Sequence, residues 1–592
     1  MAFLPITKDE LINLGWDWVD VIIVTGDAYV DHPAFGAAVI GRMLEYHGFR
    51  VALLPQPNWR DDGRDFIKLG KPRLFFGVTA GAMDSMVNHY TAHKRLRSND
   101  AYTPDGKSGF RPDYPTIVYT KLLKQLYPDT PVILGGIEAS LRRLTHYDYW
   151  QDKLLPSILV QSEADMLVYG MGEHTIVKIA QALARGKSLQ TQYNTAQTAF
   201  MVTRETLEQN WDTTFKNTPT HWLHAHAACV QDKRKQAENF VIFEQESNKI
   251  QSQRLIQPLL QDIRQETGMS CPNADQSYVV INPSAPPFTE QQMDESFDLP
   301  YTRLPHPKYR KRGVVPAYEM IRHSINIHRG CFGGCAFCTI SAHQGKHSVC
   351  RSEQSILKEL DNVVAMDDFK GHITDVGGPT ANMYKMNGMT QSQCTLCSRY
   401  SCIHPKICPN LHIDHKPLIA LYEKVRHHPK VKKLSIGSGI RYDLFDNESP
   451  NPDWDYAEYV IRYCVSGRLK VAPEHTELHV LNLLRKPSFD RFVQFKNFFD
   501  TCNRRHSLRQ QLIPYFISSL PGCHIDDMYR LASTLKQIGH PTPETVQDFT
   551  PTPMTLATEM YYTGLNPYTM TPVACARTDK EKQAQKQIFF RR

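Results

Sequence analysis

The sequence predicts an α/β protein built from two consecutive series of alternating strands and helices. Short apolar runs rich in β-branched residues recur through residues 20–186 and again after residue 324. Stretches with helical periodicity follow many of these runs. A polar, Gln- and Asn-rich segment separates the two series. We therefore expect two folded domains joined by a connector.

The first series, residues 1–186, is expected to form a doubly wound parallel sheet. Its strand candidates are DVIIVTG, RVALLPQ, PRLFFGV, TPVILGG and ADMLVYG. Between the first two runs, AFGAAVIGRMLEYHG is typical of an amphipathic helix with Gly48 as its C-terminal cap. Its apolar face would contain Phe35, Val39, Ile40, Met43 and Leu44.

Residues 187–313 are expected to be a polar, partly irregular connector, with the stretches INPSAPPF and KYRKR. The second series, residues 314–575, has six strand candidates: SINIHRG, HITDVGG, KKLSIGS, RLKVAPE, QLIPYFISSL and ETVQDFT. Six strands that alternate with helices indicate an open or partial barrel. One intervening helix is expected to start at an N-cap Ser352 and another to end at Gly539. Residues 576–592 are expected to form a charged helical tail.

The overall composition argues against several classes of protein. The net charge of +7 is spread over 592 residues without a block of like charges, so it does not by itself indicate a nucleic-acid partner. The N-terminus lacks a basic start followed by an apolar run, and no apolar stretch approaches the length of a membrane span. We expect a cytoplasmic protein with no membrane partner. In a reducing compartment, closely spaced cysteines indicate metal ligands more than disulfides.

Three cysteines directly follow the first strand of the second series. HRGCFGGCAFC places Cys331, Cys335 and Cys338 in a Cys-x3-Cys-x2-Cys pattern. Three thiolates on a four-iron cluster leave one iron open to a chelating ligand. The neighbouring residues Gly330, Gly333 and Gly334 would let the backbone approach the sulfurs. The alternative is a structural zinc site completed by His343 or His347.

These residues resemble the radical S-adenosylmethionine (SAM) superfamily, which carries Cys-x3-Cys-x-aromatic-Cys; Phe337 fills the aromatic position. The resemblance implies a [4Fe-4S] cluster on the three cysteines, with SAM chelating its open iron. It also implies reductive cleavage of SAM to a 5′-deoxyadenosyl radical, so that the cofactor performs the difficult chemistry. The expected fold is then a partial (β/α)6 radical SAM barrel.

Further candidates follow the other strands, where βα loops gather reactive residues. Gly377, Gly378 and Pro379 occupy the position of the Gly-Gly-Glu-like stretch that binds the SAM amino group in the superfamily. Because Pro379 replaces Glu, backbone carbonyls would have to do that binding. Ser438 follows the third strand and Glu474 the fourth, and Arg441 is a further candidate for a SAM or substrate contact. Ordinary turns or a rim ion pair remain the alternatives.

More narrowly, the chain resembles the YgiQ family of uncharacterised radical SAM proteins. The resemblance rests on TAGAMDSMVNHYTAHKRLRSNDAYTPDG, VILGGIEASLRRLTHYDYW and DFTPTPMTLATEMYYTG and covers most of residues 1–575. Members of this family are expected to carry a further tail beyond the terminal helix, near the start of which this sequence ends. The resemblance does not imply a substrate.

The first domain also resembles the Rossmann-like, cobalamin-binding-type domain found before some radical SAM barrels. Gly135-Gly136 and Gly170-Met171-Gly172 end two strands, where glycines let a ligand approach the sheet. However, no Asp-x-His-x-x-Gly string is present, and Asp31-His32-Pro33 lacks the spaced glycine. We therefore do not expect cobalamin, although the glycines leave it open, and favour a role in docking substrate or capping the barrel.

A second cysteine group lies in an insertion at residues 384–415. Its members are Cys394, Cys397, Cys402 and Cys408, in the pattern Cys-x2-Cys-x4-Cys-x5-Cys. Four thiolates bind either one zinc ion or an auxiliary iron–sulfur cluster. The nearby His404, His412 and His415 are expected to face solvent or the interior of the loop.

The sequence therefore predicts a radical SAM enzyme that modifies an unknown substrate, with RNA or protein as compatible classes. Such an enzyme needs an electron donor such as flavodoxin or ferredoxin. The alternative is a non-catalytic, zinc-stabilised binding scaffold that could bind RNA. Neither the oligomeric state nor the fate of SAM, consumed or regenerated, follows from the residues.

Overall fold

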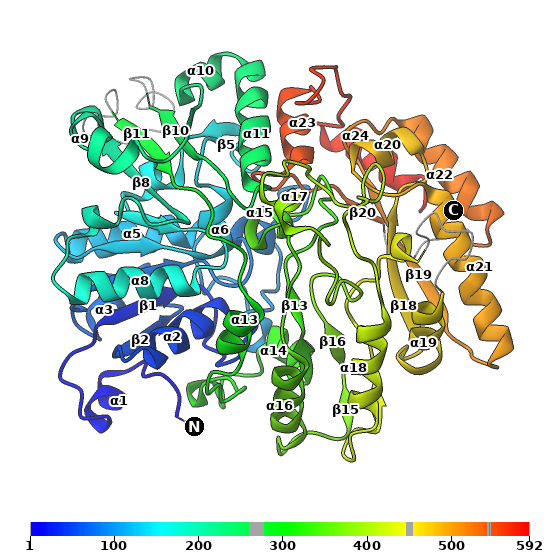
Figure 1. The fold of residues 1–592 in the computed structure, drawn as a ribbon, viewed down its shortest axis with the longest axis horizontal. Helices are drawn as coiled ribbons and strands as arrows, with labels where there is room; N and C mark the ends of the chain where they lie inside the picture. The colour runs from blue at the N-terminus through cyan, green and yellow to red at the C-terminus, as the bar shows by residue number, and fades with distance from the viewer. Residues whose placement is uncertain (1, 260–276, 446–453, 541–543, 545, 591–592) are drawn as a thin grey trace. The chain divides into compact units, whose positions relative to one another are not determined.

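The computed structural model describes residues 2–259, 277–445, 454–540, 544 and 546–590. The chain divides into two compact units (Figure 1). The N-terminal unit comprises Met1–Pro286, Glu295–Arg322 and Thr552–Met554, and the C-terminal unit comprises Pro287–Asp294, His323–Pro551 and Thr555–Arg592. The change between the units therefore lies near residue 323, whereas the sequence suggested residue 314.

A nine-stranded mixed sheet forms the centre of the N-terminal unit, in the order β2-β1-β3-β4-β7-β8-β11-β10-β9. Its first part consists of the five expected strands, β1 (Val21–Thr25), β2 (Val51–Pro55), β3 (Phe75–Thr79), β4 (Val132–Leu134) and β7 (Met166–Val168). All neighbours in this part are parallel. Every residue of β1 and β2 is buried, as expected for parallel strands covered on both faces. The predicted α/β fold is confirmed.

Helices connect these parallel strands. They include α2 (Gly36–Tyr46), α3 (Arg64–Ile67), α5 (Pro115–Leu126), α6 (Gly136–Leu141), α7 (Ile158–Ser162) and α8 (Glu173–Ala184). The predicted apolar face of α2 is buried at Val39, Met43 and Leu44. Shorter elements are α1 (Lys8–Asn13), α4 (Ser85–His89) and the hairpin of β5 (His146–Asp148) and β6 (Lys153–Leu155).

The expected connector differs from the structure. Four strands from residues 187–313 extend the N-terminal sheet: β8 (Thr198–Thr203), β9 (Thr220–Trp222), β10 (Arg254–Pro258) and β11 (Ser277–Ile281). The pairs β7–β8, β8–β11 and β10–β11 are antiparallel. The same region contains α9 (Arg204–Gln209), α10 (His226–Gln231), α11 (Lys233–Ser247) and α13 (Glu290–Phe297), followed by α14 (Pro316–Ile321). Residues 260–276 lie outside the described part. Most of the described segment is thus part of the first folded unit.

The C-terminal unit contains strands at all six expected positions. They are β12 (Ser324–Asn326), β15 (His372–Ile373) with β16 (Asp375–Gly377), β17 (Lys433–Leu434), β18 (Arg468–Glu474), β19 (Gln511–Ser518) and β20 (Val546–Asp548). Parallel pairing joins β12 to β16, β15 to β17, and β18 to β19 and β20. The first strand continues into β13 (His328–Arg329), which pairs with β14 (Val349–Cys350) in antiparallel fashion.

Helices alternate with these strands: α15 (Ile340–Gln344), α16 (Glu353–Val364), α17 (Gln391–Thr395), α18 (Lys416–Arg426), α19 (Asp455–Tyr463), α20 (Leu478–Leu483), α21 (Phe489–Arg505), α22 (Ile525–Gln537), α23 (Leu556–Thr563) and α24 (Asp579–Gln587). Ser352 caps α16 as predicted, since its hydroxyl accepts a hydrogen bond from the Ser355 amide. Gly539 adopts a left-handed φ of +78° after α22. In the described part of the chain, no helix combines the length and the apolar character that a bilayer crossing requires.

Candidate functional site

The loop with Cys331, Cys335 and Cys338 follows β13 and is held at its start and in its middle by backbone hydrogen bonds. The Cys331 amide donates to the Gly345 carbonyl (3.2 Å). In the middle of the loop, Ala336 donates to the Leu484 carbonyl (3.0 Å) and accepts from the Ala557 amide (2.8 Å). Segments far apart in the sequence thus fix the backbone that carries the three sulfurs.

Glycines are required where this loop passes other backbone. A Cβ atom on Gly330 would lie 2.0 Å from the His347 carbonyl oxygen, and one on Gly334 would lie 2.1 Å from the Tyr400 carbonyl oxygen. Both residues have a positive φ, +80° and +58°. At Gly333, a Cβ would meet the Arg441 guanidinium at 2.7 Å and the Cys331 sulfur at 3.4 Å. The expected close approach to the sulfurs is therefore present at Gly333.

Replacing Gly334 by alanine is expected to displace the cysteine loop. The left-handed backbone costs a non-glycine residue about 1–2 kcal/mol, and the contact with the Tyr400 carbonyl adds to that cost. We expect Gly334→Ala to bind several-fold less iron after anaerobic reconstitution, with an unchanged circular dichroism spectrum. The control is Gly36→Ala, where a Cβ meets no atom within 4 Å. Equal iron content in the two variants would contradict the predicted role of this glycine.

The three thiols lie in one environment, with Cys331 buried and Cys335 and Cys338 half-buried. Burial raises the pKa of Cys331, and the neighbouring Cys335 raises it further against the opposing Arg441 cation. Burial, followed by Cys335 and Cys331, raises the pKa of Cys338 to about 12. Without a positively charged ligand, thiolates at Cys331 and Cys338 would therefore be unfavourable here. A bound metal supplies that charge and displaces the protons, so this donor set fits a metal cluster.

The guanidinium of Arg441 is the nearest cation to the sulfurs that the structure records. Its Nη1 donates to the Cys335 sulfur at 3.3 Å, and its Nε and Nη2 bind both carboxylate oxygens of Asp443 at 2.9 and 2.7 Å. Although burial raises the pKa of Asp443, Arg441 outweighs it and holds that pKa below its usual value. Arg441 thus connects the cysteine loop to a buried ion pair.

Glu474 and Lys486 form a second buried pair beside the cysteine loop. Their charged groups are 3.6 Å apart, and their side chains are only 8% and 7% exposed. Glu474 ends β18 at a bulge in its pairing with β19 and has a left-handed φ of +68°. Lys486 is close enough to Cys338 to oppose the effect of burial on its pKa. Such strain in a buried acidic residue is common at functional sites.

The Gly377-Gly378-Pro379 stretch lies against the first strand and the loop after the third strand. A Cβ on Gly378 would meet the His328 ring at 2.6 Å, and one on Gly377 would meet the Ser438 hydroxyl at 2.6 Å. Directly after Pro379, the Thr380 hydroxyl lies 3.7 Å from the Cys331 sulfur. The structure therefore brings Gly377, Ser438 and Cys331 into one neighbourhood.

Asp375 explains why Ser438 lies there. The carboxylate of the half-buried Asp375 accepts from the amides of Gly437 (3.0 Å) and Ser438 (3.3 Å) and from the Ser438 hydroxyl. Burial raises the pKa of Asp375, against the effect of these hydrogen bonds. The Ser438 hydroxyl is thus already used in holding its own loop. Phe337, the aromatic residue of the cysteine motif, is half-buried.

Sequence reasoning missed several of these partners: Asp375, Asp443, Lys486 and the buried Lys346 of the second cysteine group. The spacing of Arg441 and Asp443 could have indicated an ion pair. For Lys486 and Lys346 no local signal exists, because their partners are distant in the sequence.

The second cysteine group lies in and after α17. Burial raises the pKa of Cys402 to about 11; Lys346 opposes this effect, while Cys408 and Cys397 add to it. Burial and then Cys397 raise the pKa of Cys394. The four thiols are therefore close enough to influence one another. Of the three nearby histidines, which were expected to face solvent or the interior of the loop, His415 is buried and stacks on Tyr456, with ring centroids 4.7 Å apart.

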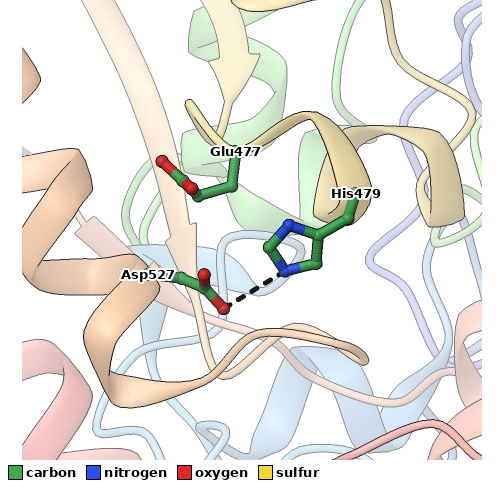
Figure 2. A group of neighbouring side chains, drawn as sticks. All are labelled: Glu477, His479 and Asp527. Carbon is green, nitrogen blue, oxygen red and sulfur yellow. Dashed lines mark hydrogen bonds and ion pairs between the residues drawn. The ribbon is translucent and has the colours of Figure 1, made fainter.

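Among the described residues, the set that gathers three metal-ligand atoms within 4.8 Å of one another is Glu477, His479 and Asp527 (Figure 2). Arg530 donates to Glu477 at 2.8 Å and also pairs with Asp527, and Asp527 caps α22 through the His524 amide at 2.7 Å. The two carboxylates are therefore already balanced, and we interpret this set as an ion-pair network. Neither cysteine group forms so compact a set, and neither His343 nor His347 completes one.

Of the expected cobalamin-type features of the N-terminal unit, Gly136 and Asp31 make contacts within the protein. A Cβ on Gly136 would meet the Thr79 hydroxyl at 2.3 Å, so this glycine serves internal packing. Asp31 pairs with the buried Arg42. His32 is 2% exposed, and its Nδ1 accepts from the Ala34 amide, which leaves the proton on Nε2. A histidine in this state does not fit a ligand to cobalt.

Comparison with known proteins identifies the class of the chain. Residues 3–324 match the family model described as Radical SAM N-terminal, and residues 544–591 match a domain of unknown function, DUF3362. The chain is 56% identical to a UPF0313 protein of Porphyromonas gingivalis, over 99% of this chain and 90% of that protein. It is 43% identical to the UPF0313 protein YgiQ of Escherichia coli, over 99% and 83% of the two chains. The chain belongs to the UPF0313 (YgiQ) family.

Solved structures with a related arrangement are more distant. The methyltransferase TsrM of Kitasatospora setae, with cobalamin and a [4Fe-4S] cluster bound, matches with a TM-score of 0.47 and 13% identity, over 91% of this chain and 74% of TsrM. The cobalamin-dependent SAM radical enzyme OxsB, with aqua-cobalamin bound, has a TM-score of 0.46 and 10% identity, over 88% and 52%. Similarity at this level assigns neither a ligand nor a function.

Proposed function

We propose that the protein is a radical SAM enzyme, with a [4Fe-4S] cluster on Cys331, Cys335 and Cys338. The observation that carries this proposal is the loop geometry: one buried and two half-buried thiols share one environment on a backbone that only glycine can follow at Gly330 and Gly334. The match to the Radical SAM N-terminal family model supports it independently. Three ligands leave one iron for SAM.

The bound cluster and SAM would supply the chemistry, which is the reductive cleavage of SAM to a 5′-deoxyadenosyl radical. The protein's own residues hold and shield these groups. Arg441 donates to the Cys335 sulfur and places a positive charge beside the anionic ligands. The backbone of Gly377, Gly378 and Pro379 would offer carbonyls to the SAM amino group. Ser438 would contribute mainly by fixing its loop through Asp375.

We propose Glu474 as the carboxylate that contacts SAM or the substrate. Its ion-pair partner is Lys486. Glu474 has a left-handed backbone and is the last residue of β18. In a βα barrel, the loops that carry reactive residues gather at this end of the strands. The parallel strand pairs β12–β16, β15–β17 and β18–β19–β20 support a partial barrel as the finer fold. A low-potential electron carrier such as flavodoxin or ferredoxin would supply the electron, and the substrate class is left open.

Anaerobic reconstitution of the full chain tests this function. We expect a brown protein that contains iron and sulfide and converts SAM to 5′-deoxyadenosine when dithionite is added. A colourless protein with zinc bound at the triad, and no SAM cleavage, would instead support a zinc-stabilised binding scaffold and overturn the proposal.

A further inference from the structure

The insertion with the second cysteine group packs directly on the loop of the first. The Cys402 amide donates to the Phe332 carbonyl at 3.0 Å, and the Tyr400 carbonyl lies against Gly334. One apolar cluster contains Cys331 and Phe332 together with Ile403, with Cys402 packed against it. The second group, whose four cysteines are half-buried, therefore contacts the loop of the first group through Cys402.

The side chain of Lys346 is buried against this insertion. The residue is 2% exposed, and its ammonium group donates to the carbonyls of Cys397 (3.2 Å) and Arg399 (2.8 Å). The Cys397 sulfur lies 3.8 Å from the same nitrogen. Within the part of the chain that the structure describes, no recorded ion pair joins Lys346 to a carboxylate. A buried cation without an anionic partner costs several kcal/mol, so a counter-charge is expected nearby.

The segment that carries the four cysteines contains no carboxylate that could be this counter-charge, and Asp414, which follows it, accepts a hydrogen bond from the Lys416 amide (2.9 Å). Residues 390–413 include Arg399 and Lys406 but neither Asp nor Glu. The only groups in this segment that can become strongly anionic are the four thiols. Cysteinyl thiolates are stable under burial when a metal binds them. Once a metal is bound, the thiolates would supply the negative charge that Lys346 lacks. Lys346 would in turn supply a positive charge beside the thiolates.

The spacing of the sulfurs favours an iron–sulfur cluster over a single zinc ion. A single tetrahedral zinc with four Zn–S bonds would hold them about 3.8 Å apart. Among the described residues, no three of these sulfurs lie within 4.8 Å of one another. Ligands of an iron–sulfur cluster bind different irons and lie further apart. Four thiolates also carry more negative charge than the cluster core carries positive charge, which suits a buried cation.

We propose that Cys394, Cys397, Cys402 and Cys408 bind a second iron–sulfur cluster and that the Lys346 ammonium group balances its negative charge. This inference concerns a site separate from the SAM-binding triad and does not require that the triad bind a cluster.

The first test uses the full chain with Cys331, Cys335 and Cys338 all changed to alanine. After anaerobic reconstitution, we expect it to retain iron, sulfide and an electron paramagnetic resonance signal on reduction, and to lose them when Cys397→Ala is added. Absence of iron, or one zinc per chain in a colourless protein, would overturn the proposal. Because SAM cleavage is not the readout, failure of the triad as a SAM site would leave this result unaffected.

The second test measures the reduction potential of the remaining cluster in that triple variant. A nearby cation favours the more negative, reduced state, so Lys346→Met is expected to shift the potential to a more negative value, whereas Lys346→Arg should shift it less. The matched control is Lys406→Met, which removes an exposed lysine of the same insertion. Equal shifts in Lys346→Met and Lys406→Met would refute the role of Lys346.

Discussion

A Cys335→Ala variant is expected to lose the cleavage of SAM while the chain stays folded. Cys335 is half-buried and contacts Arg441, so its removal deletes a ligand without opening a large cavity. Loss of an outer-shell partner of a metal already costs 10–100-fold, and loss of a ligand should cost at least roughly a hundredfold. The formation of 5′-deoxyadenosine with dithionite measures this effect.

The matched control is Cys575→Ala, which removes a cysteine that belongs to neither of the two cysteine groups. The Cys575 sulfur interacts only with backbone carbonyls of Met560 and Val573 among its recorded hydrogen bonds. This variant should cleave SAM at the unaltered rate. Cleavage by Cys335→Ala at a similar rate would contradict the assignment of the triad as the SAM site.

An Arg441→Met variant is expected to lose stability as well as iron. Arg441 and Asp443 have side chains only 10% and 12% exposed, so the substitution leaves a nearly buried carboxylate without its partner. Removing one partner of a buried pair typically costs 3–5 kcal/mol. The change also removes the cation beside Cys335, which should weaken binding of an anionic cluster. Thermal unfolding and the iron content after reconstitution measure the two effects.

The double variant Arg441→Met, Asp443→Leu separates these effects. It removes the unpaired carboxylate, so stability should largely return, whereas the iron content should stay low. If the double variant regained full iron content, the proposed electrostatic role of Arg441 at the cysteine loop would be wrong.

Much of the fold could be predicted because each strand carries its own local signal. The six strands after residue 324 and the five before residue 170 are short apolar runs followed by polar or glycine-rich ends. The strands β8 to β11 were missed, although TAFMVT and SYVVI have β-branched residues, because the polar composition around them dominated the interpretation. Their antiparallel pairing with the first sheet depends on contacts distant in sequence.

Some residues of the candidate site could likewise be predicted from local sequence motifs, whereas others could not. The cysteines, Gly377 and Ser438 have local motifs, and the structure brings them together near Cys331. The partners that control charge, such as Lys486 beside Cys338 and Lys346 beside Cys397, come from other segments and have no motif. Only the folded chain reveals them.

The backbone hydrogen bonds that hold Ala336 have a consequence for folding of the protein during its synthesis. The hydrogen bond from Ala557 joins the cysteine loop to a helix near the end of the chain. At roughly 5–20 residues per second, the cysteines leave the ribosome on the order of ten seconds or more before that helix is synthesised. During this interval the cysteine loop lacks its hydrogen bond from Ala557, so the loop is expected to reach its final conformation, and to bind iron stably, only after α23 has been synthesised.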